Sequence, residues 1–584
     1  MTDNWTDELA ARARDWVADD PDPVTRHELT DLIDAADGGD VVAVADVVDR
    51  FADDLEFGTA GLRGAIGAGP NRMNLSVVIR AAAAIARWIH DTGGEEAARR
   101  GVAIGFDARY RSTDFAEATA AVMAAAGIRA HVLPEPLPTP VLAFAVRHLD
   151  AAAGVMVTAS HNPPQDNGYK VYDGSGRQIV APTDAHIAGH IAAIQWVSSV
   201  PRSGPDDPDI VRLDDAVAAA YVAGAGAVGL VSKARDVRIA YTAMHGVGAG
   251  TFRRVLSAAG FAPAVEVAEQ IEPDPDFPTV AFPNPEEPGA LDLGLALASQ
   301  TGAHVLIAND PDADRLGVAL PDPSRGDPAT PAGWRSLRGD EIGVVLADHL
   351  LRHGHLDSST VLATSIVSSS LLGRMAAAAG VPFAETLTGF KWITRAPGEG
   401  QTLGFGYEEA LGFCVGDLVA DKDGITAAVV FAEAVAVQAA EGRTVFDVLD
   451  DLARSHGVHQ TGQWAARVAG TEGMTRLTAA MASLRAQPPT TLAGRPVRSV
   501  VDLIDGDDGA HLAPSDVLTF HLDEARIIVR PSGTEPKLKC YIEVVQSVAD
   551  DAADPQAALK AARARAKATL AELTSAIAEA TGLA

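Results

Sequence analysis

The chain has 584 residues, which is enough for three to five domains with several hydrophobic cores. Its 78 acidic residues outnumber its 47 lysines and arginines, and the net charge of −31 argues against nucleic acid or an anionic membrane as a partner. Neither a signal sequence nor a run long enough to span a bilayer is visible, so we expect a cytoplasmic protein. Cys414 and Cys540 lack metal-ligand spacing, and we expect two small core residues, although the sequence leaves a disulfide between them open.

The sequence begins with an acidic, helical lead and then alternates helix-like and strand-like stretches. Helices are expected at 79–90, 113–126 and 140–148, and strands at 102–106, 128–133 and 153–157. Such alternation predicts crossover connections and a mixed or parallel sheet covered by helices. A run rich in proline, glycine and aspartate at 201–208 indicates a linker.

The same alternation returns twice before the character of the chain changes. The second series has strands at 237–241 and 303–308 and helices at 249–259 and 290–300. A stretch rich in proline and glycine follows at 321–333. The third series then occupies 340–352, 360–366, 369–379 and 383–386. From about residue 460 onward a helix, strands and a terminal helix at 555–580 indicate an α+β domain. The predicted fold class is therefore α/β, with three similar mixed-sheet domains in series at 1–205, 206–325 and 326–458 and a C-terminal α+β domain at 459–584.

A presented serine lies in the segment Thr158-Ala159-Ser160-His161-Asn162-Pro163-Pro164, which follows the apolar run 153–157. A strand that ends in a polar turn presents a hydroxyl at its tip. Serine is a weak nucleophile at its ordinary pKa and needs a base, a phosphate or a metal nearby. His161 is not expected to be that base, because adjacent side chains in an extended segment point to opposite faces. Taken alone, Ser160 is better explained as an ordinary turn residue, and other segments change that interpretation.

Three aspartates, Asp310, Asp312 and Asp314, stand at alternate positions directly after an apolar run. Oxygen-rich loops of this kind bind hard cations. An EF-hand needs glycine at the sixth loop position and glutamate at the twelfth, where this chain has Arg315 and Pro321. The spacing therefore predicts a Mg²⁺ site with room for water and a phosphate oxygen, and a solvated acidic turn is the alternative.

Two loops nearer the C-terminus could bind a sugar phosphate. In the segment 530–537, a guanidinium, two hydroxyls and glycine-freed backbone N–H groups can form an anion cradle after the strand 525–529, and a hairpin turn is expected there in either case. The glycine-punctuated segment 404–412 carries Glu408 and Glu409, whose carboxylates can accept hydrogen bonds from neighbouring sugar hydroxyls. A solvated pair of acids is the alternative interpretation of the second loop.

Along the chain, the serine segment, the aspartate segment, the segment 404–412 and the segment 530–537 follow one another at wide spacing. In this order they resemble the motifs of the α-D-phosphohexomutase superfamily, the phosphoglucomutases and phosphomannomutases, over nearly the whole chain. Further matches are 57–64, which reads Phe-Gly-Thr-Ala-Gly-Leu-Arg-Gly, and 388–392, which reads Thr-Gly-Phe-Lys-Trp. Many members have Glu-x-Ser in the sugar loop, whereas this chain has Glu408-Glu409-Ala410, which is similar to the branch of phosphoglucomutase-2 and phosphopentomutase-type enzymes. The resemblance implies that the four domains surround a central cleft.

The resemblance also implies a phosphoserine at Ser160, with Mg²⁺ held by Ser160 and the three aspartates, and positive charge from Arg63 and Arg315. Lys170 would be the general acid/base that acts on the sugar hydroxyl, a role that requires a lowered pKa. A static phosphate contact by Lys170 is the alternative. His161 is included among the expected catalytic residues as part of the serine motif.

The implied reaction interconverts glucose 1-phosphate and glucose 6-phosphate through glucose 1,6-bisphosphate, which also primes Ser160 as an activator. The expected substrate-binding residues are Thr388, Gly389, Lys391, Glu408, Glu409, Lys422, Arg530, Ser532, Gly533, Thr534 and Lys537. The alternatives are a phosphopentomutase or phosphomannomutase, a metal-dependent sugar phosphatase and a non-catalytic sugar-phosphate binder. The sequence leaves the oligomeric state open between monomer and dimer.

Overall fold

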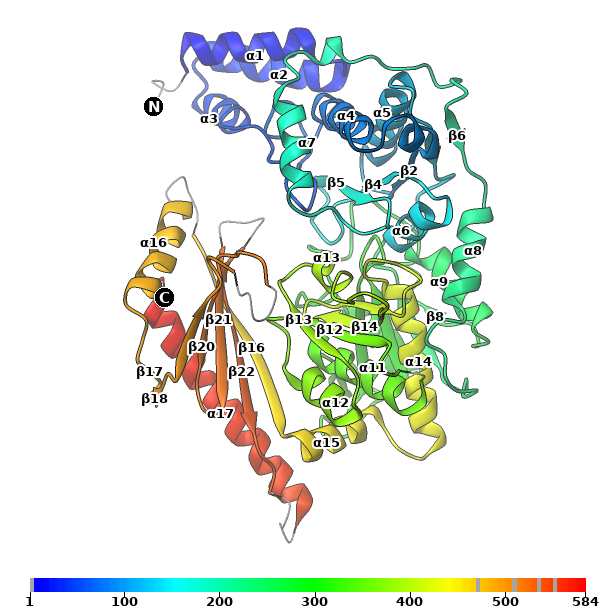
Figure 1. The fold of residues 1–584 in the computed structure, drawn as a ribbon, viewed down its shortest axis with the longest axis vertical. Helices are drawn as coiled ribbons and strands as arrows, with labels where there is room; N and C mark the ends of the chain where they lie inside the picture. Colours follow the sequence, from blue (N-terminus) through cyan, green and yellow to red (C-terminus); the bar gives the residue numbers. More distant parts are fainter. Residues whose placement is uncertain are drawn as a thin grey trace. The chain divides into compact units, whose positions relative to one another are not determined.

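The computed structural model describes residues 5–354, 356–468, 473–506, 512–532, 537–549 and 554–583. The chain forms two compact units, and each is described by itself. Unit 1 comprises Met1–Leu337 and Gly412–Ala436, and unit 2 comprises Arg338–Leu411 and Val437–Ala584. Figure 1 follows the chain by colour from the N-terminus to the C-terminus.

The N-terminal lead of unit 1 is helical, as predicted. Its helices are α1 (Asp7–Asp19), α2 (Pro23–Asp37) and α3 (Val41–Arg50) (Figure 1). Each begins after a residue whose side chain accepts a backbone N–H of the first turn, namely Thr6, Asp22 and Asp40. Leu29 and Val47 are fully buried where the apolar faces of these helices meet.

The first α/β segment of unit 1 is built on a mixed six-stranded sheet with the order β1-β5-β4-β2-β3-β6. Its strands are β1 (Leu62–Ala65), β2 (Val102–Phe106), β3 (Ala130–Val132), β4 (Ala153–Val157), β5 (Asp166–Asp173) and β6 (Ile210–Arg212), and its helices are α4 (Leu75–Arg100), α5 (Ser112–Ala125), α6 (Thr139–His148), α7 (Thr183–Ala192) and the short η1 (Val197–Ser199). Strand β5 is antiparallel to β1 and β4, and the other neighbours are parallel.

Three details of this segment differ from the sequence prediction or extend it. The helix predicted at 79–90 is part of the longer α4, which is interrupted at Gly94 by a left-handed φ of 57°. The strand predicted at 128–133 is only three residues long. The predicted linker at 201–208 contains no helix or strand, but β6, which follows it, pairs with β3 and extends the first sheet.

The second α/β segment of unit 1 has a five-stranded mixed sheet with the order β11-β10-β9-β7-β8. Its elements are β7 (Ile239–Thr242), β8 (Val265–Glu266), β9 (Val305–Asn309), β10 (Leu316–Pro321), β11 (Trp334–Ser336), α8 (Ala216–Ala225), α9 (Gly248–Ala258), α10 (Asp292–Thr301) and η2 (Pro331–Gly333), and β15 (Gly412–Val415) and most of α14 (Gly424–Ala440) also belong to unit 1. Every residue of β9 is buried, which explains the apolar run 305–308 that precedes Asn309 and the aspartates.

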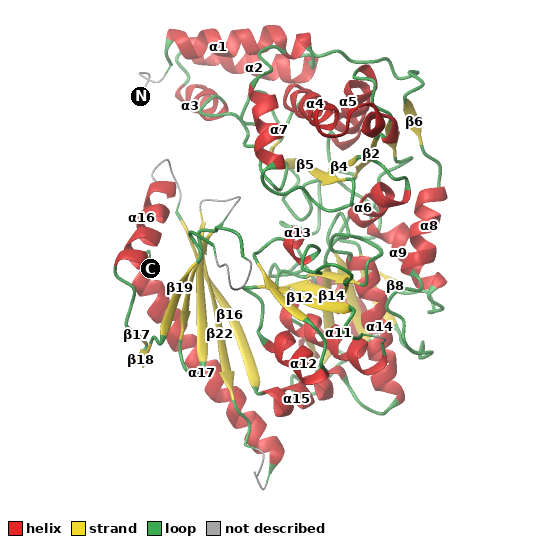
Figure 2. Cartoon of the chain, in the orientation of Figure 1, coloured by secondary structure: helices red, strands yellow, loops and turns green. Residues whose placement is uncertain are grey.

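Unit 2 contains the third α/β segment and the C-terminal sheet (Figure 2). The third segment has β12 (Thr360–Ser365), β13 (Phe383–Thr386), β14 (Thr402–Glu408), α11 (Gly339–His353), α12 (Leu371–Ala379), α13 (Phe390–Ile393) and α15 (Val445–His456). Strand β12 pairs in parallel with both β13 and β14. The predicted α/β character is therefore present in this segment as well.

The C-terminal segment is an antiparallel sheet with the order β16-β22-β21-β20-β19. Its elements are β16 (Val458–Arg467), β19 (Ser499–Asp502), β20 (Leu518–His521), β21 (Ala525–Pro531), β22 (Lys537–Gln546), the small pair β17 (Thr491–Leu492) and β18 (Arg495–Pro496), α16 (Gly473–Ala486) and α17 (Pro555–Thr581). Helix α17 packs on the sheet and shares a core with it that includes Ile527, Ile542 and Leu573. The predicted fold class is confirmed, whereas the domain limits and the central cleft stay predictions.

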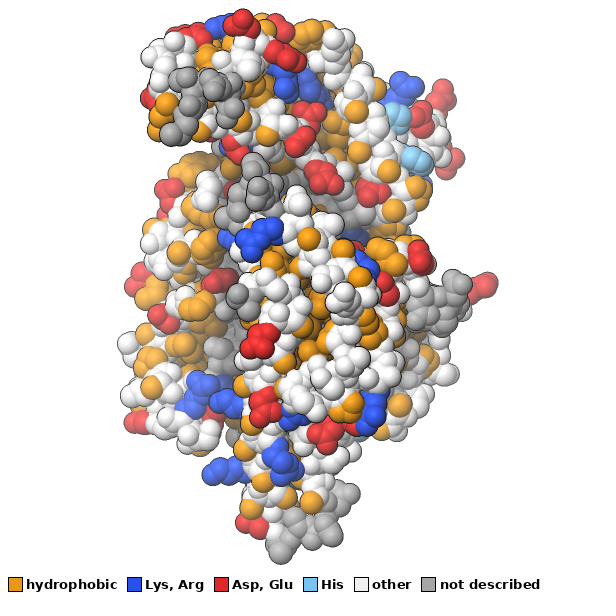
Figure 3. All heavy atoms as spheres, turned by 90° about the vertical axis from the view of Figure 1, so that its left-hand side faces the viewer, with side chains coloured by type: hydrophobic (Ala, Val, Ile, Leu, Met, Phe, Trp, Pro, Cys, Tyr) orange, Lys and Arg blue, Asp and Glu red, His pale blue; other side chains and the backbone are white. Residues whose placement is uncertain are grey.

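Both cysteines are buried and free, so the open question of a disulfide is answered. Over the described residues, no single helix combines the length and hydropathy needed to cross a membrane, and α14 meets that measure only jointly with α15, across an 89° bend. On the face drawn in Figure 3, acidic side chains are scattered among basic and apolar ones.

Candidate active site

Ser160 lies in the turn that follows β4. Its backbone is left-handed, with a φ of 52°, and its N–H donates to the Thr158 hydroxyl at 2.9 Å. The Ser160 hydroxyl donates to Asp310 Oδ2 at 2.8 Å, and only 2% of the residue is exposed. The serine loop and the aspartate loop, which the sequence suggested separately, therefore meet at this hydrogen bond.

His161 lies beside the serine hydroxyl, contrary to the expectation from an extended backbone. Its Nδ1 is 3.3 Å from Ser160 Oγ. The expectation was wrong because the left-handed turn at Ser160 removes the alternation of side chains that an extended strand would have. Burial and the positive charges of Arg315 and Arg63 hold the pKa of His161 well below its ordinary value, so the imidazole is neutral at pH 7.

The three aspartates form a compact, buried cluster in the loop after β9. All three are 0% exposed, and one oxygen of each lies within 4.8 Å of the others. Asn309 closes the loop, because its amide donates to the Arg315 carbonyl at 2.7 Å and its side-chain oxygen accepts from the Tyr241 hydroxyl at 3.0 Å. The alternative of a solvated acidic turn is excluded, since none of these carboxylates reaches solvent.

Two oxygens of the cluster have no hydrogen-bond partner within the described part of the chain. They are Asp312 Oδ1 and Asp314 Oδ1, and a buried carboxylate oxygen of this kind is costly unless a cation compensates it. Asp310 and Ser160 contribute two more hard oxygen atoms beside them. Three carboxylates and a hydroxyl are donors that Mg²⁺ prefers, and they leave room for water and a phosphate oxygen. The residues present therefore fit a divalent cation.

Two buried lysines hold other oxygens of this cluster. Lys170 Nζ donates to Asp312 Oδ2 at 2.8 Å and to Asp314 Oδ2 at 2.9 Å. Burial alone would lower the pKa of Lys170, but the two carboxylates outweigh burial and the pKa is raised, so the lowered pKa expected for an acid/base is not found. Lys422, expected among the substrate-binding residues, has its Nζ 2.8 Å from Asp314 Oδ2.

Arg63 and Arg315 border the same cluster. Arg63 lies on β1 opposite Gly168 of β5 and donates to the Asn162 side chain at 3.2 Å. Arg315 Nε is 4.0 Å from Asp310 Oδ2. Unit 1 thus brings together all the residues expected for catalysis and metal binding.

The sequence analysis missed two buried residues that contact these loops, Arg109 and Thr139. The Arg109 guanidinium donates to four backbone carbonyls of the serine loop, those of Ser160 (2.6 Å), Asn162 (2.5 Å), Pro163 (2.9 Å) and Asp166 (3.2 Å). The Thr139 hydroxyl donates to Asp312 Oδ2 at 2.6 Å. Each residue stands at the end of a predicted element, after the strand 102–106 or before the helix 140–148, and that position was a usable signal.

In unit 2, the expected sugar loop follows β14. Glu408 Oε1 accepts the backbone N–H of Gly389 at 2.7 Å, which joins the loop to the turn before α13. Glu409 Oε2 is 3.4 Å from the hydroxyls of Ser365 and Ser368. The two carboxylates are half-buried rather than freely solvated. Thr388 lies in the same turn as Gly389, and Lys391 lies in α13.

Tyr541 on β22 connects the expected sugar and phosphate loops within unit 2. Burial raises the pKa of its phenol, and the negative charges of Glu409 and Glu408 act in the same direction. Arg530 hydrogen-bonds to Tyr541 and acts in the opposite direction. Charges from both loops therefore act on one tyrosine, which the sequence analysis did not single out.

The expected phosphate loop connects β21 to β22 in an antiparallel hairpin, as predicted. The Ser532 N–H, just after β21, donates to the carbonyl of Lys537, the first residue of β22, at 2.7 Å. Gly533 and Thr534 lie outside the described residues. Arg530 precedes the turn on β21 and Lys537 begins β22.

The chain matches the family models described as Phosphoglucomutase/phosphomannomutase, alpha/beta/alpha domain I at residues 54–198, domain II at 219–323 and domain III at 338–455, and the C-terminal domain at 490–560. It is 43% identical to the probable phosphomannomutase of Haemophilus influenzae over 81% of this chain and 93% of that protein. Identity is 35% to the probable phosphoribomutase of Schizosaccharomyces pombe (90% and 92% covered) and 32% to the phosphoglucomutase of Staphylococcus haemolyticus (85% and 91% covered).

Proposed function

The chain belongs to the phosphoglucomutase/phosphomannomutase family of the α-D-phosphohexomutase superfamily and is a phosphosugar mutase, and on this premise we propose that it interconverts glucose 1-phosphate and glucose 6-phosphate. The observation that carries the proposal is the 2.8 Å hydrogen bond from Ser160 Oγ to Asp310 Oδ2 beside a buried cluster of carboxylates. Phosphoryl transfer depends mainly on alignment and charge stabilisation, and a serine held against a cation site supplies both.

In the proposed reaction, Ser160 carries a phosphoryl group between the two ends of the sugar. The bond from Ser160 Oγ to phosphorus breaks as a sugar hydroxyl oxygen bonds to phosphorus, and the hydroxyl proton ends on Ser160 Oγ, which gives glucose 1,6-bisphosphate and a free serine hydroxyl. The other phosphoryl group then passes to Ser160 Oγ and the isomeric monophosphate leaves. The same bisphosphate would prime an unphosphorylated serine.

The cation site is proposed to hold Mg²⁺ through Asp310, Asp312, Asp314 and Ser160. When bound, Mg²⁺ would supply positive charge that stabilises the negative charge on the oxygens of the phosphoryl group. We assign Lys170 to holding Asp312 and Asp314 rather than to proton transfer, because its ammonium is bound by both carboxylates. Lys422 has the same role at Asp314. Arg63 contacts Asn162 of the serine loop, Arg315 lies beside Asp310, and the neutral His161 lies beside Ser160 Oγ.

The residues of unit 2 are proposed to bind the rest of the ligand. Glu408 and Glu409 accept hydrogen bonds from sugar hydroxyls. The phosphate that does not react would be bound by Arg530, Ser532, Gly533 and Thr534, with Thr388, Gly389, Lys391 and Lys537 as further contacts. A phosphate site of this kind accepts either phosphate of the bisphosphate, so one set of residues can serve both directions of the reaction.

A pentose phosphate is the second candidate substrate. Ala410 stands where many members of the superfamily have a serine that contacts the sugar, so one hydroxyl contact is missing in this loop. The relative named probable phosphoribomutase is similar over 90% of this chain, which favours the same alternative. The similarity to a probable phosphomannomutase keeps mannose 1-phosphate as a third sugar to be compared.

The test is a coupled mutase assay on glucose 1-phosphate, ribose 1-phosphate and mannose 1-phosphate, with and without the matching bisphosphate. The highest kcat/KM is expected for glucose 1-phosphate, and a higher value for ribose 1-phosphate would reassign the sugar.

Ser160→Ala should fold and lose activity by several orders of magnitude, and intact-mass measurement should show a phosphate on wild-type chains that the variant lacks. Net release of inorganic phosphate would instead favour a phosphatase.

A further inference from the structure

Thr139 makes two contacts to one aspartate of the cation site. It is the first residue of α6 and is completely buried. Its backbone N–H donates to the Asp312 carbonyl oxygen at 3.0 Å, and its hydroxyl donates to Asp312 Oδ2 at 2.6 Å. Both the main chain and the side chain of Asp312 are therefore held by a residue that is 173 positions away in the sequence.

The hydroxyl of Thr139 is not used for its own helix. The N-cap of α6 is Pro138, whose ring offers no hydrogen-bond acceptor, and Thr139 is the first residue inside the helix. The hydrogen bond goes to Asp312 instead. The side chain of Thr139 therefore contacts the aspartate cluster rather than the first turn of α6.

The two oxygens of Asp312 have different surroundings. Oδ2 accepts from the Thr139 hydroxyl and from Lys170 Nζ, whereas Oδ1 is buried and has no hydrogen-bond partner within the described residues. Two hydrogen bonds to Oδ2 fix the rotation of the planar carboxylate. Oδ1, on the other side of the carboxylate, is thereby held in one orientation. Carboxylates that bind metals are commonly oriented by such hydrogen bonds, and the orientation strengthens metal binding.

We propose that Thr139 is a positioning residue that orients Asp312 so that Oδ1 is presented to a divalent cation. The inference rests on the cation site of the proposed function and adds to it a residue that does not itself bind the metal. Lys170 alone cannot replace Thr139, because its ammonium is shared between Asp312 and Asp314 and does not select one orientation of either. Loss of the hydroxyl should therefore weaken cation binding directly.

The experiment compares Thr139→Val, which removes the hydroxyl at nearly constant volume, with Thr139→Ser, which keeps it. Thr119→Val is the matched control, because Thr119 is equally buried, belongs to the same α/β segment and donates to the Phe115 carbonyl at 2.7 Å, away from the aspartates. Mn²⁺ binding to each metal-free protein is measured by electron paramagnetic resonance and by titration calorimetry. Thermal unfolding without metal is recorded in parallel.

We expect Thr139→Val to weaken Mn²⁺ binding about 10- to 100-fold, in line with the loss of hydrogen bonds that orient metal ligands. Thr139→Ser should stay within about 3-fold of wild type, and Thr119→Val should bind Mn²⁺ like wild type whatever its thermal stability. Wild-type affinity in Thr139→Val, or an equal loss in Thr119→Val, would overturn the inference and leave the cation site standing. Absence of Mn²⁺ binding by the wild-type protein would overturn both this inference and the cation site.

Discussion

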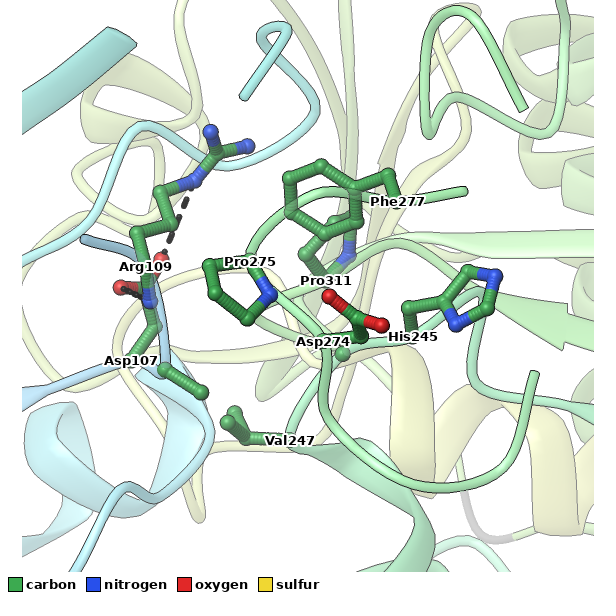
Figure 4. Close-up of a pocket in the computed structure, with 10 residues that line it drawn as sticks. Asp107, Arg109, His245, Val247, Asp274, Pro275, Phe277 and Pro311 are labelled. Carbon is green, nitrogen blue, oxygen red and sulfur yellow. Dashed lines mark hydrogen bonds and ion pairs between the residues drawn. The ribbon is translucent and has the colours of Figure 1, made fainter. Parts of the chain in front are cut away.

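At the scale of single residues, Arg109 determines much of the shape of the serine loop. Its Nε is 3.3 Å from Asp107 Oδ2, and its guanidinium carbon lies 4.9 Å from the centre of the Phe277 ring (Figure 4). The planar guanidinium carries five donors in a fixed fork, so it can serve several carbonyl oxygens at once. Four backbone carbonyls accept hydrogen bonds from the Arg109 guanidinium, and one of them is the carbonyl of Ser160.

Arg109→Lys tests this dependence, because it keeps the charge but replaces the fork with an ammonium that has three donors. We expect kcat to fall about 10- to 100-fold, since a small displacement of a reacting group has an effect of this order. KM should change little, because Arg109 has no assigned sugar contact. Steady-state kinetics measures the two constants, and Arg212→Lys, in a surface pair with Glu117, should change neither. A raised KM at constant kcat would contradict the role.

The left-handed backbone of Ser160 is the feature of the site that the sequence could not predict. Serine adopts this conformation rarely, and here its carbonyl is held by Arg109 and its hydroxyl by Asp310, which are 51 and 150 residues away. The place of His161 followed from the same turn, so the prediction for it failed as well. The position of Thr139 before the predicted helix 140–148 was a usable signal, but its contact to Asp312 exists only after two α/β segments have packed.

At the scale of elements, the sequence was most informative where a strand is completely buried. The strands β2 and β4 have the predicted limits because an uninterrupted apolar run allows few alternatives. The strand predicted at 128–133 was too long, since only its middle residues pair with β2 and β6. Loops at strand ends were located correctly from sequence, but their internal geometry depends on contacts from other elements.

Helix α14 starts at a buried aspartate whose environment affects stability. Asp423 Oδ1 accepts the N–H groups of Ile425 and Thr426, and both of its oxygens accept from the Tyr221 hydroxyl at 2.9 Å. Burial nevertheless raises the pKa of Asp423 to about 6, from an ordinary value of 3.8. The charged form of Asp423 is thus disfavoured in the folded protein. At pH values between the unfolded and the folded pKa, the folded protein therefore binds more protons than the unfolded chain.

The sign of the effect follows from this proton balance. The free energy of unfolding should fall as pH rises from about 4 to about 6, by up to about 3 kcal/mol, and then stay constant with respect to this group. Asp423→Asn keeps an acceptor for the helix start and has no charge, so the wild-type and variant curves should converge at low pH, diverge between about pH 4 and about pH 6, and stay apart at higher pH with the variant more stable. Urea unfolding across this range measures the difference. Parallel curves for the wild type and Asp423→Asn would contradict the prediction.

At the scale of the whole molecule, the expected functional residues fall into two groups. The residues proposed for phosphoryl transfer and cation binding belong to unit 1, whereas the expected sugar and phosphate loops belong to unit 2. The net charge of −31 does not describe the first group, because Arg63, Lys170, Arg315 and Lys422 stand against the three aspartates there. The acid excess is therefore carried by other parts of the chain.

Arg530→Ala tests whether the two groups act on one ligand. If Arg530 binds the phosphate that does not react, loss of its charged hydrogen bonds costs about 2–3 kcal/mol. We expect KM to rise and kcat/KM to fall roughly 30- to 150-fold. Phosphorylation of Ser160 by added glucose 1,6-bisphosphate, followed by intact-mass measurement, should weaken in parallel, because that ligand would use the same arginine. Arg498→Ala, in an exposed pair with Asp523, is the control and should change neither readout. If the variant keeps the wild-type KM and the wild-type phosphorylation of Ser160, the loop after β21 is a hairpin turn without a part in substrate binding.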